Sequence, residues 1–97
     1  MINAEARLGD NVIVNTGAIV EHDCDVASHV HIATGTQLGG TVSVGEGSHI
    51  GIGVSVRQGI SIGRNVIVGA GAVVVKAVPD NVMIAGVPAR VLKKLEG

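Results

Sequence analysis

The sequence contains no phenylalanine, tyrosine or tryptophan, two prolines and a single cysteine among its 97 residues. Without aromatic rings on which bases could stack, and with a net charge of −1, it offers no surface suited to nucleic acid. One cysteine excludes an internal disulfide and fits a reducing compartment. There is no apolar run near the ~20 residues of a membrane span, and no signal-peptide pattern. We therefore expect a cytoplasmic protein that binds neither nucleic acid nor membranes.

The sequence does contain a repeat of six residues. Ile, Leu and Val make up 32 of the 97 residues, and one of them stands at every sixth position thirteen times in succession. The chance probability of such a run is on the order of one in a million. The series comprises Ile2, Leu8, Val14, Val20, Val26, Ile32, Leu38, Val44, Ile50, Val56, Ile62, Val68 and Val74. A small or β-branched residue follows four positions after each member, and glycine recurs one position after.

A period of six fits a short strand followed by a corner. Three such units close a triangular coil, and successive coils stack at about 4.8 Å, with the large aliphatic residue and the small one inside. The repeat therefore predicts an all-β parallel β-helix over residues 1–79. A turn at 79–81 should end the repeat. Residues 80–97 should then form a strand at 82–84 and a short basic helix from Ala89 to Leu95, packed on the same domain. A core this small also favours oligomerisation.

Residues 18 positions apart should lie in one column, which places His22 beneath Gly40. His22 interrupts a run of small corner residues, and its imidazole can accept a proton near neutral pH. We expect Gly40 to leave a hollow over this ring, with a backbone N–H nearby for a thioester or other carbonyl. Glu21 and Asp23 flank His22, although neighbours in a strand point to opposite faces and only a corner relaxes that rule. A solvated polar turn remains the alternative.

Other polar positions allow two interpretations each. His31 either contacts a ligand held between subunits or stacks on His49 at the surface, since the two share a column. Cys24 occupies a small inward position and is predicted to be core, because an apolar environment raises the pKa of a thiol. Arg90, followed by Lys93 and Lys94, either meets a phosphate or belongs to a solvated tail.

Several stretches together resemble a known family. The segment from Val14 to Cys24, followed by residues 30–33, 44–47, 68–74 and 86–90, resembles the C-terminal domain of sugar O- and N-acyltransferases. The members in question are of the sialic-acid O-acetyltransferase and bacillosamine N-acetyltransferase type, and the resemblance covers essentially the whole chain. It implies a left-handed β-helix, a homotrimer with sites between subunits, acetyl-CoA as co-substrate, and a sugar or nucleotide sugar as acceptor.

The same resemblance implies roles for individual residues. His22 would be the general base, Asp23 the acidic residue that increases its basicity, and His31 a contact for acetyl-CoA. Backbone groups near Gly40, Ile52 and Ala70 would line the cleft for the thioester and the pantetheine arm, and Arg90 would meet the nucleotide phosphates. No metal is implied.

Two alternatives remain open. Family members carry an N-terminal α/β domain that binds the sugar nucleotide, and this chain begins where that domain would end. We therefore expect either a fragment or a free-standing repeat domain, and a non-catalytic trimeric scaffold is one alternative function. A zinc enzyme of the γ-carbonic-anhydrase type is the other, and it is less favoured because the four histidines include no His-x4-His pair.

Overall fold

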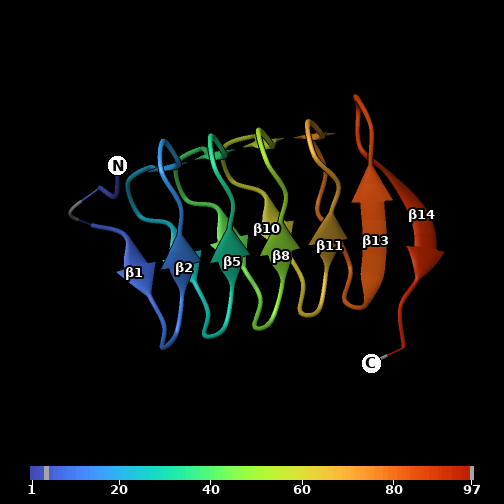
Figure 1. Ribbon diagram of the computed structural model, residues 1–97, viewed down its shortest axis with the longest axis horizontal. Helices are drawn as coiled ribbons and strands as arrows, with labels where there is room; N and C mark the ends of the chain where they lie inside the picture. Colours follow the sequence, from blue (N-terminus) through green and yellow to red (C-terminus); the bar gives the residue numbers. More distant parts are fainter. Residues whose placement is uncertain (4, 97) are drawn as a thin grey trace.

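The computed structural model describes residues 1–3 and 5–96 and shows an all-β solenoid of about four coils, 34 × 25 × 22 Å in extent (Figure 1). Strands of two residues alternate with corners along the chain, following the period of six. The prediction of an all-β coil built from hexapeptides is therefore confirmed. Within the described residues, no helix is long and apolar enough to cross a membrane.

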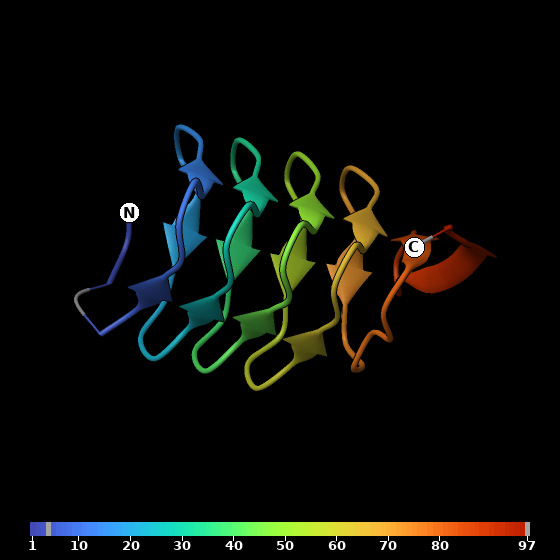
Figure 2. The same ribbon diagram turned by 90° about the horizontal axis from the view of Figure 1, so that it is seen from below.

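The strands form three faces, which Figure 2 shows from a second side. Face A consists of β3 (Ile19–Val20), β6 (Gln37–Leu38), β9 (Ser55–Val56) and β12 (Val73–Val74). Face B consists of β1 (Arg7–Leu8), β4 (Asp25–Val26), β7 (Ser43–Val44) and β10 (Ser61–Ile62). Face C consists of β2 (Ile13–Val14), β5 (His31–Ile32), β8 (His49–Ile50), β11 (Ile67–Val68), β13 (Val82–Ala85) and β14 (Arg90–Lys94). Pairing is parallel throughout the repeat, and His31 lies opposite His49 as the column rule predicts.

The core is a single stack of aliphatic side chains inside the coil. Members of the six-residue series from Val20 to Val74 are buried, and small residues such as Ala18 and Ala72 fill the space beside them. Burying one such aliphatic side chain stabilises a fold by about 1.5–3 kcal/mol, before the entropy of the chain is counted. Ile2 and Leu8 remain 45% and 39% exposed, because their coil has a neighbouring coil on one side only.

The C-terminal segment differs from the prediction. The turn at 79–81 and the following strand are confirmed, and that strand is β13. The predicted helix from Ala89 to Leu95 is wrong, because the chain reverses after Gly86 and forms β14, antiparallel to β13 (Figure 1). A helix of seven residues is marginal on its own. The outer edge of β13 offers unpaired backbone groups that β14 satisfies, and this pairing decides the structure.

Candidate active site

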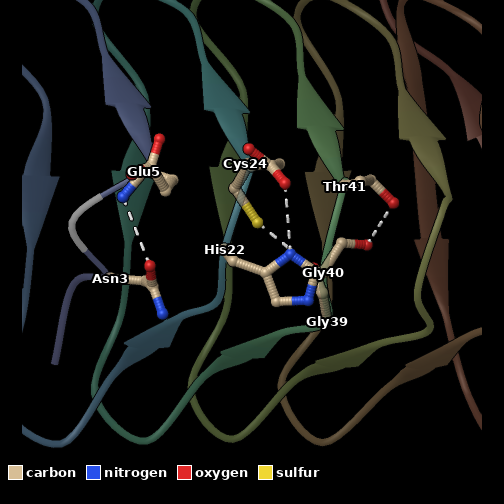
Figure 3. Close-up of polar contacts among 8 residues, drawn as sticks. Asn3, Glu5, His22, Cys24, Gly39, Gly40 and Thr41 are labelled. Atoms are coloured by element: carbon tan, nitrogen blue, oxygen red, sulfur yellow. Dashed lines mark hydrogen bonds and ion pairs between the residues drawn. The ribbon is translucent and has the colours of Figure 1, made fainter.

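His22 lies at the corner where the chain passes from face A to face B, which we call the A–B corner (Glu21–Cys24, Gly39–Val42 and Arg57–Ile60). Its imidazole packs on Gly40 of the next coil, as Figure 3 shows. A Cβ on Gly40 would lie 2.8 Å from both Cε1 and Nε2 of His22. The expected hollow above the ring is therefore wrong, because the imidazole itself fills the space that the missing side chain leaves.

The carboxylate of Asp23 contacts the same imidazole. Asp23 has a left-handed backbone (φ 57°), and its Oδ2 lies 3.3 Å from Nδ1 of His22. A proton on Nδ1 would be donated to Asp23, which leaves Nε2, the nitrogen beside Gly40, as the proton acceptor. Both side chains are more than half exposed, at 56% and 55%, so water weakens their attraction and the contact mainly orients the ring.

Gly40 is buried beneath the His22 ring, and its backbone N–H makes no hydrogen bond within the described part of the chain. The carbonyl of the same peptide group, on Gly39, accepts a hydrogen bond from the thiol of Cys24 at 3.1 Å. At the matching place of another corner, the N–H of Arg64 donates to Oδ1 of Asp80 at 2.8 Å. An N–H at this position can therefore bind a negatively charged oxygen.

Cys24 itself belongs to the core, as predicted. Its side chain is fully buried and forms no disulfide. Burial raises the pKa of the Cys24 thiol, and hydrogen bonding from the backbone of Val42 and Glu21 only partly offsets this rise. A buried, protonated thiol is a poor nucleophile. The burial of Cys24 therefore argues against this thiol as a covalent nucleophile.

His31 lies on face C and is not in contact with the A–B corner of its own chain. Its Nε2 lies 3.0 Å from Nδ2 of Asn15, and its ring meets that of His49 edge-on, with 4.6 Å between centroids. Burial lowers the pKa of His49, and the neighbouring His31 lowers it further. Asn15 was missed in the sequence because it lies 16 positions before His31 rather than 18, so the column rule does not pair them.

The remaining predicted residues lie elsewhere on the coil. Ile52 and Ala70 stack at the corner between faces C and A, where the N–H of Gly71 donates to the carbonyl of Ile52 at 2.8 Å. Ile52 is 62% exposed. Arg90 begins β14 and lines a cavity at the end of the coil together with Lys76, a cation that the sequence reasoning also missed. One chain alone therefore brings together His22, Asp23 and Gly40, and holds Ile52, Ala70 and Arg90 apart from them.

Histidine, cysteine and carboxylate side chains do not gather into metal sites in the part of the chain that the structure describes. No group of three or more of them is placed to hold an ion within residues 1–3 and 5–96. The described residues of a single chain thus offer no ligand set of the kind that zinc prefers.

Comparisons with known proteins give this site its context. Residues 41–76 match the family described as bacterial transferase hexapeptide (six repeats). Over 96% of its length, the chain is 45% identical to a perosamine N-acetyltransferase variant from Caulobacter crescentus, crystallised with CoA and GDP-perosamine (TM-score 0.94, 44% of that chain covered). This chain belongs to the hexapeptide-repeat acetyltransferase family.

Two further solved structures are similar to this chain. The acetyltransferase domain of PglB from Neisseria gonorrhoeae, in complex with acetyl coenzyme A, is 38% identical (TM-score 0.89, 94% of this chain and 53% of that chain covered). A maltose O-acetyltransferase from Clostridium difficile is 30% identical (TM-score 0.90, 100% and 65% covered). The chain spans about half the length of these relatives.

Proposed function

We propose that this hexapeptide-repeat domain transfers an acetyl group from acetyl-CoA to a hydroxyl or amine of a sugar, which is carried on a nucleotide in at least one similar protein. The observation that carries the proposal is the arrangement at the A–B corner. A histidine oriented by Asp23 presents Nε2 beside Gly40, whose N–H has no acceptor among the described residues. Acetyl transfer from a thioester needs at least a proton acceptor and, next to it, a backbone N–H that is free to bind the carbonyl oxygen.

His22 and Gly40 have separate roles in the proposed acetyl transfer. His22 Nε2 takes the proton from the acceptor hydroxyl or amine, whose oxygen or nitrogen bonds to the thioester carbonyl carbon. Gly40 N–H donates to the carbonyl oxygen, where negative charge develops. When the carbon–sulfur bond breaks, protonated His22 returns its proton to the departing sulfur. A general base typically contributes ~10²–10⁴-fold, and holding both reactants in one cleft supplies much of the remaining rate.

The donor fits along the A–B corner column. His22, Gly40 and Gln58 follow one another at intervals of 18 residues, and Lys76 comes 18 residues after Gln58. Three coil spacings separate His22 from Lys76, which is roughly 14 Å. Lys76 and Arg90 line the cavity there with the apolar Val74 and Ile84, and none of the described residues that line it is acidic. We place the phosphates of acetyl-CoA at these two cations and its pantetheine arm along the column.

A homotrimer of left-handed coils, which the family resemblance implies, is part of the proposal. The outward side chains of face C include Ile13 and Ile67, at 52% and 37% exposure, on either side of His31 and His49. Face B instead presents polar residues such as Arg7 and Asp25 outward. We propose that face C packs against a neighbouring subunit, which brings His31, Ile52 and Ala70 toward a donor held at that neighbour's A–B corner. The cytoplasm remains the proposed location, since the lone Cys24 is free and buried.

A non-catalytic scaffold is the second candidate, because the chain spans only part of its relatives. The test is release of CoA thiol from acetyl-CoA in the presence of candidate aminosugars and nucleotide sugars. We expect His22→Ala to lower turnover by ~10²–10⁴-fold, while the control His29→Ala, an exposed histidine at another corner, keeps it. Unchanged turnover in His22→Ala would exclude His22 as the general base. A scaffold would show neither turnover nor the ~2.7 kcal/mol of stabilisation expected from a ligand at a hundred times its Kd.

A further inference from the structure

Three corners of the coil each depend on a buried side chain that donates a hydrogen bond. Cys24, Thr36 and Ser48 all occupy the small inward position. Each donates to the carbonyl of the glycine fifteen residues later, at 3.1, 2.8 and 2.7 Å respectively. The acceptors are Gly39, Gly51 and Gly63, one at each type of corner.

Ser48 shows what these donors do. In some of the other corners the first residue's carbonyl accepts the N–H three residues on, as Arg57 accepts that of Ile60 at 3.3 Å. At the Gly63 corner this turn bond is replaced. The hydroxyl of Ser48 donates to Gly63 and accepts the N–H of Val66 at 3.0 Å, so one side chain bridges the turn from inside.

Cys24 bonds to the corner that carries Gly40. Its thiol donates to the carbonyl of Gly39 at 3.1 Å. No N–H of the described residues donates to the Gly39 carbonyl. Without the thiol this carbonyl would be left unpaired beside the core, which destabilises a fold. The thiol remains protonated, and so able to donate, because burial raises its pKa.

The orientation of that carbonyl determines the orientation of the Gly40 N–H. In a trans peptide group the C=O and N–H point in opposite directions. Since the Gly39 carbonyl points back to Cys24 in the preceding coil, the Gly40 N–H points forward along the stack, as the N–H of Arg64 does toward Asp80. The same corner also contacts the base directly, because the N–H of Thr41 donates to the carbonyl of His22 at 3.0 Å.

We propose that Cys24 is a positioning residue for acetyl transfer: from inside the coil it holds the Gly39–Gly40 peptide group so that the Gly40 N–H faces the oxygen of the bound thioester. This inference rests on the proposed function. It predicts that a hydroxyl can replace the thiol at this site, as Ser48 demonstrates at the neighbouring corner, whereas a methyl group cannot.

The experiment compares Cys24→Ser, Cys24→Ala and the control Ser48→Ala, which removes the same kind of bridge from the corner at Gly63. Loss of a whole oxyanion donor costs ~10²–10³-fold, so we expect misorientation in Cys24→Ala to lower kcat about tenfold, with KM for acetyl-CoA nearly unchanged. Cys24→Ser should retain kcat. Ser48→Ala should lose thermal stability as Cys24→Ala does, but keep kcat.

Amide resonances provide a readout that does not depend on turnover. In the free protein, Cys24→Ala should shift the Gly40 N–H signal, and Ser48→Ala should shift that of Arg64. If Cys24→Ala keeps kcat and leaves the Gly40 signal unmoved, the positioning role is overturned. If the unsubstituted protein turns over no acetyl-CoA, the proposed function fails, and the Gly40 signal alone then supports or overturns the orientation by Cys24.

Discussion

The imidazole of His22 and the Cα of Gly40 are in direct contact across one step of the coil. A Cβ on Gly40 would lie 2.8 Å from Nε2 and 3.4 Å from Cδ2 of the ring. The first distance is too short for a relaxed structure, so a glycine at this position is what allows the histidine to lie against the corner. Gly40, which supplies the proposed N–H donor, thus also makes room for His22, the proposed base.

Gly40→Ala should therefore separate catalysis from stability. Gly40 is not among the glycines with a left-handed backbone, so alanine fits its main chain, and the exposed ring of His22 can move aside. We expect a change in unfolding free energy within about 0.5 kcal/mol, but a loss of kcat of about 10²-fold from displacement of the ring.

The double variant of Gly40→Ala with His22→Ala is the control for that result. If Gly40 acts through the ring, adding Gly40→Ala to His22→Ala should cost much less than it does alone. Fully additive losses of kcat would contradict the role of Gly40 in positioning the His22 ring. Gly40 would then contribute only through its N–H.

Asp23→Asn tests the orienting carboxylate without disturbing the corner. Asparagine tolerates the left-handed backbone found at Asp23 (φ 57°), so the change removes the charge and little else. Because the pair is exposed, we expect a loss of kcat of about tenfold rather than the larger losses seen for buried pairs. The control is Asp25→Asn, an exposed carboxylate on face B. Equal rates in the two variants would remove Asp23 from the mechanism.

Stability should fall as the pH is lowered past the ordinary titration range of histidine. The folded-state pKa of His49 is lowered, first by burial and then by His31, so the unfolded chain binds the proton more readily. Stability therefore rises with pH through this range and is lost as the pH drops below the unfolded value of about 6.5. Denaturant unfolding at pH 7.5 and 5.5 measures the loss, and His49→Gln should reduce it. An unchanged pH dependence in that variant would contradict this account.

Face C can be tested as the subunit interface by native mass. Ile67→Asp places a charge among the outward apolar groups of face C and should convert the proposed trimer to monomers. The matched control, Ser61→Asp, makes an exposed substitution on face B and should leave the trimer intact. A monomeric unsubstituted protein, or a trimer that survives Ile67→Asp, would rule out this face.

The sequence predicts the repeat well because periodicity reports directly on which residues face inward. The column rule correctly pairs His31 with His49 and places His22 beneath Gly40. The rule locates backbone positions and says nothing of how a side chain packs on them. It therefore could not predict that the imidazole fills the expected hollow. The contact between His22 and Asp23 likewise depends on a left-handed residue at the corner, which a strand-based rule does not anticipate.

Beyond Pro79 the period ends, and with it the basis for prediction. A segment such as Arg90–Lys94 carries no local signal strong enough to choose between helix and strand. The choice is made by the free edge of β13, which is a tertiary feature. Asn15 escaped notice for a related reason, since its side chain reaches diagonally to His31 across the column.

The reversed strand β14 has a consequence for self-association. A parallel coil that ends in an open sheet could accept a second molecule end to end and grow into a filament. Here the last strand of face C runs against the others and carries Arg90, Lys93 and Lys94. A copy approaching this end would meet an exposed strand of opposite polarity that carries three cations, and not a parallel strand that continues the winding.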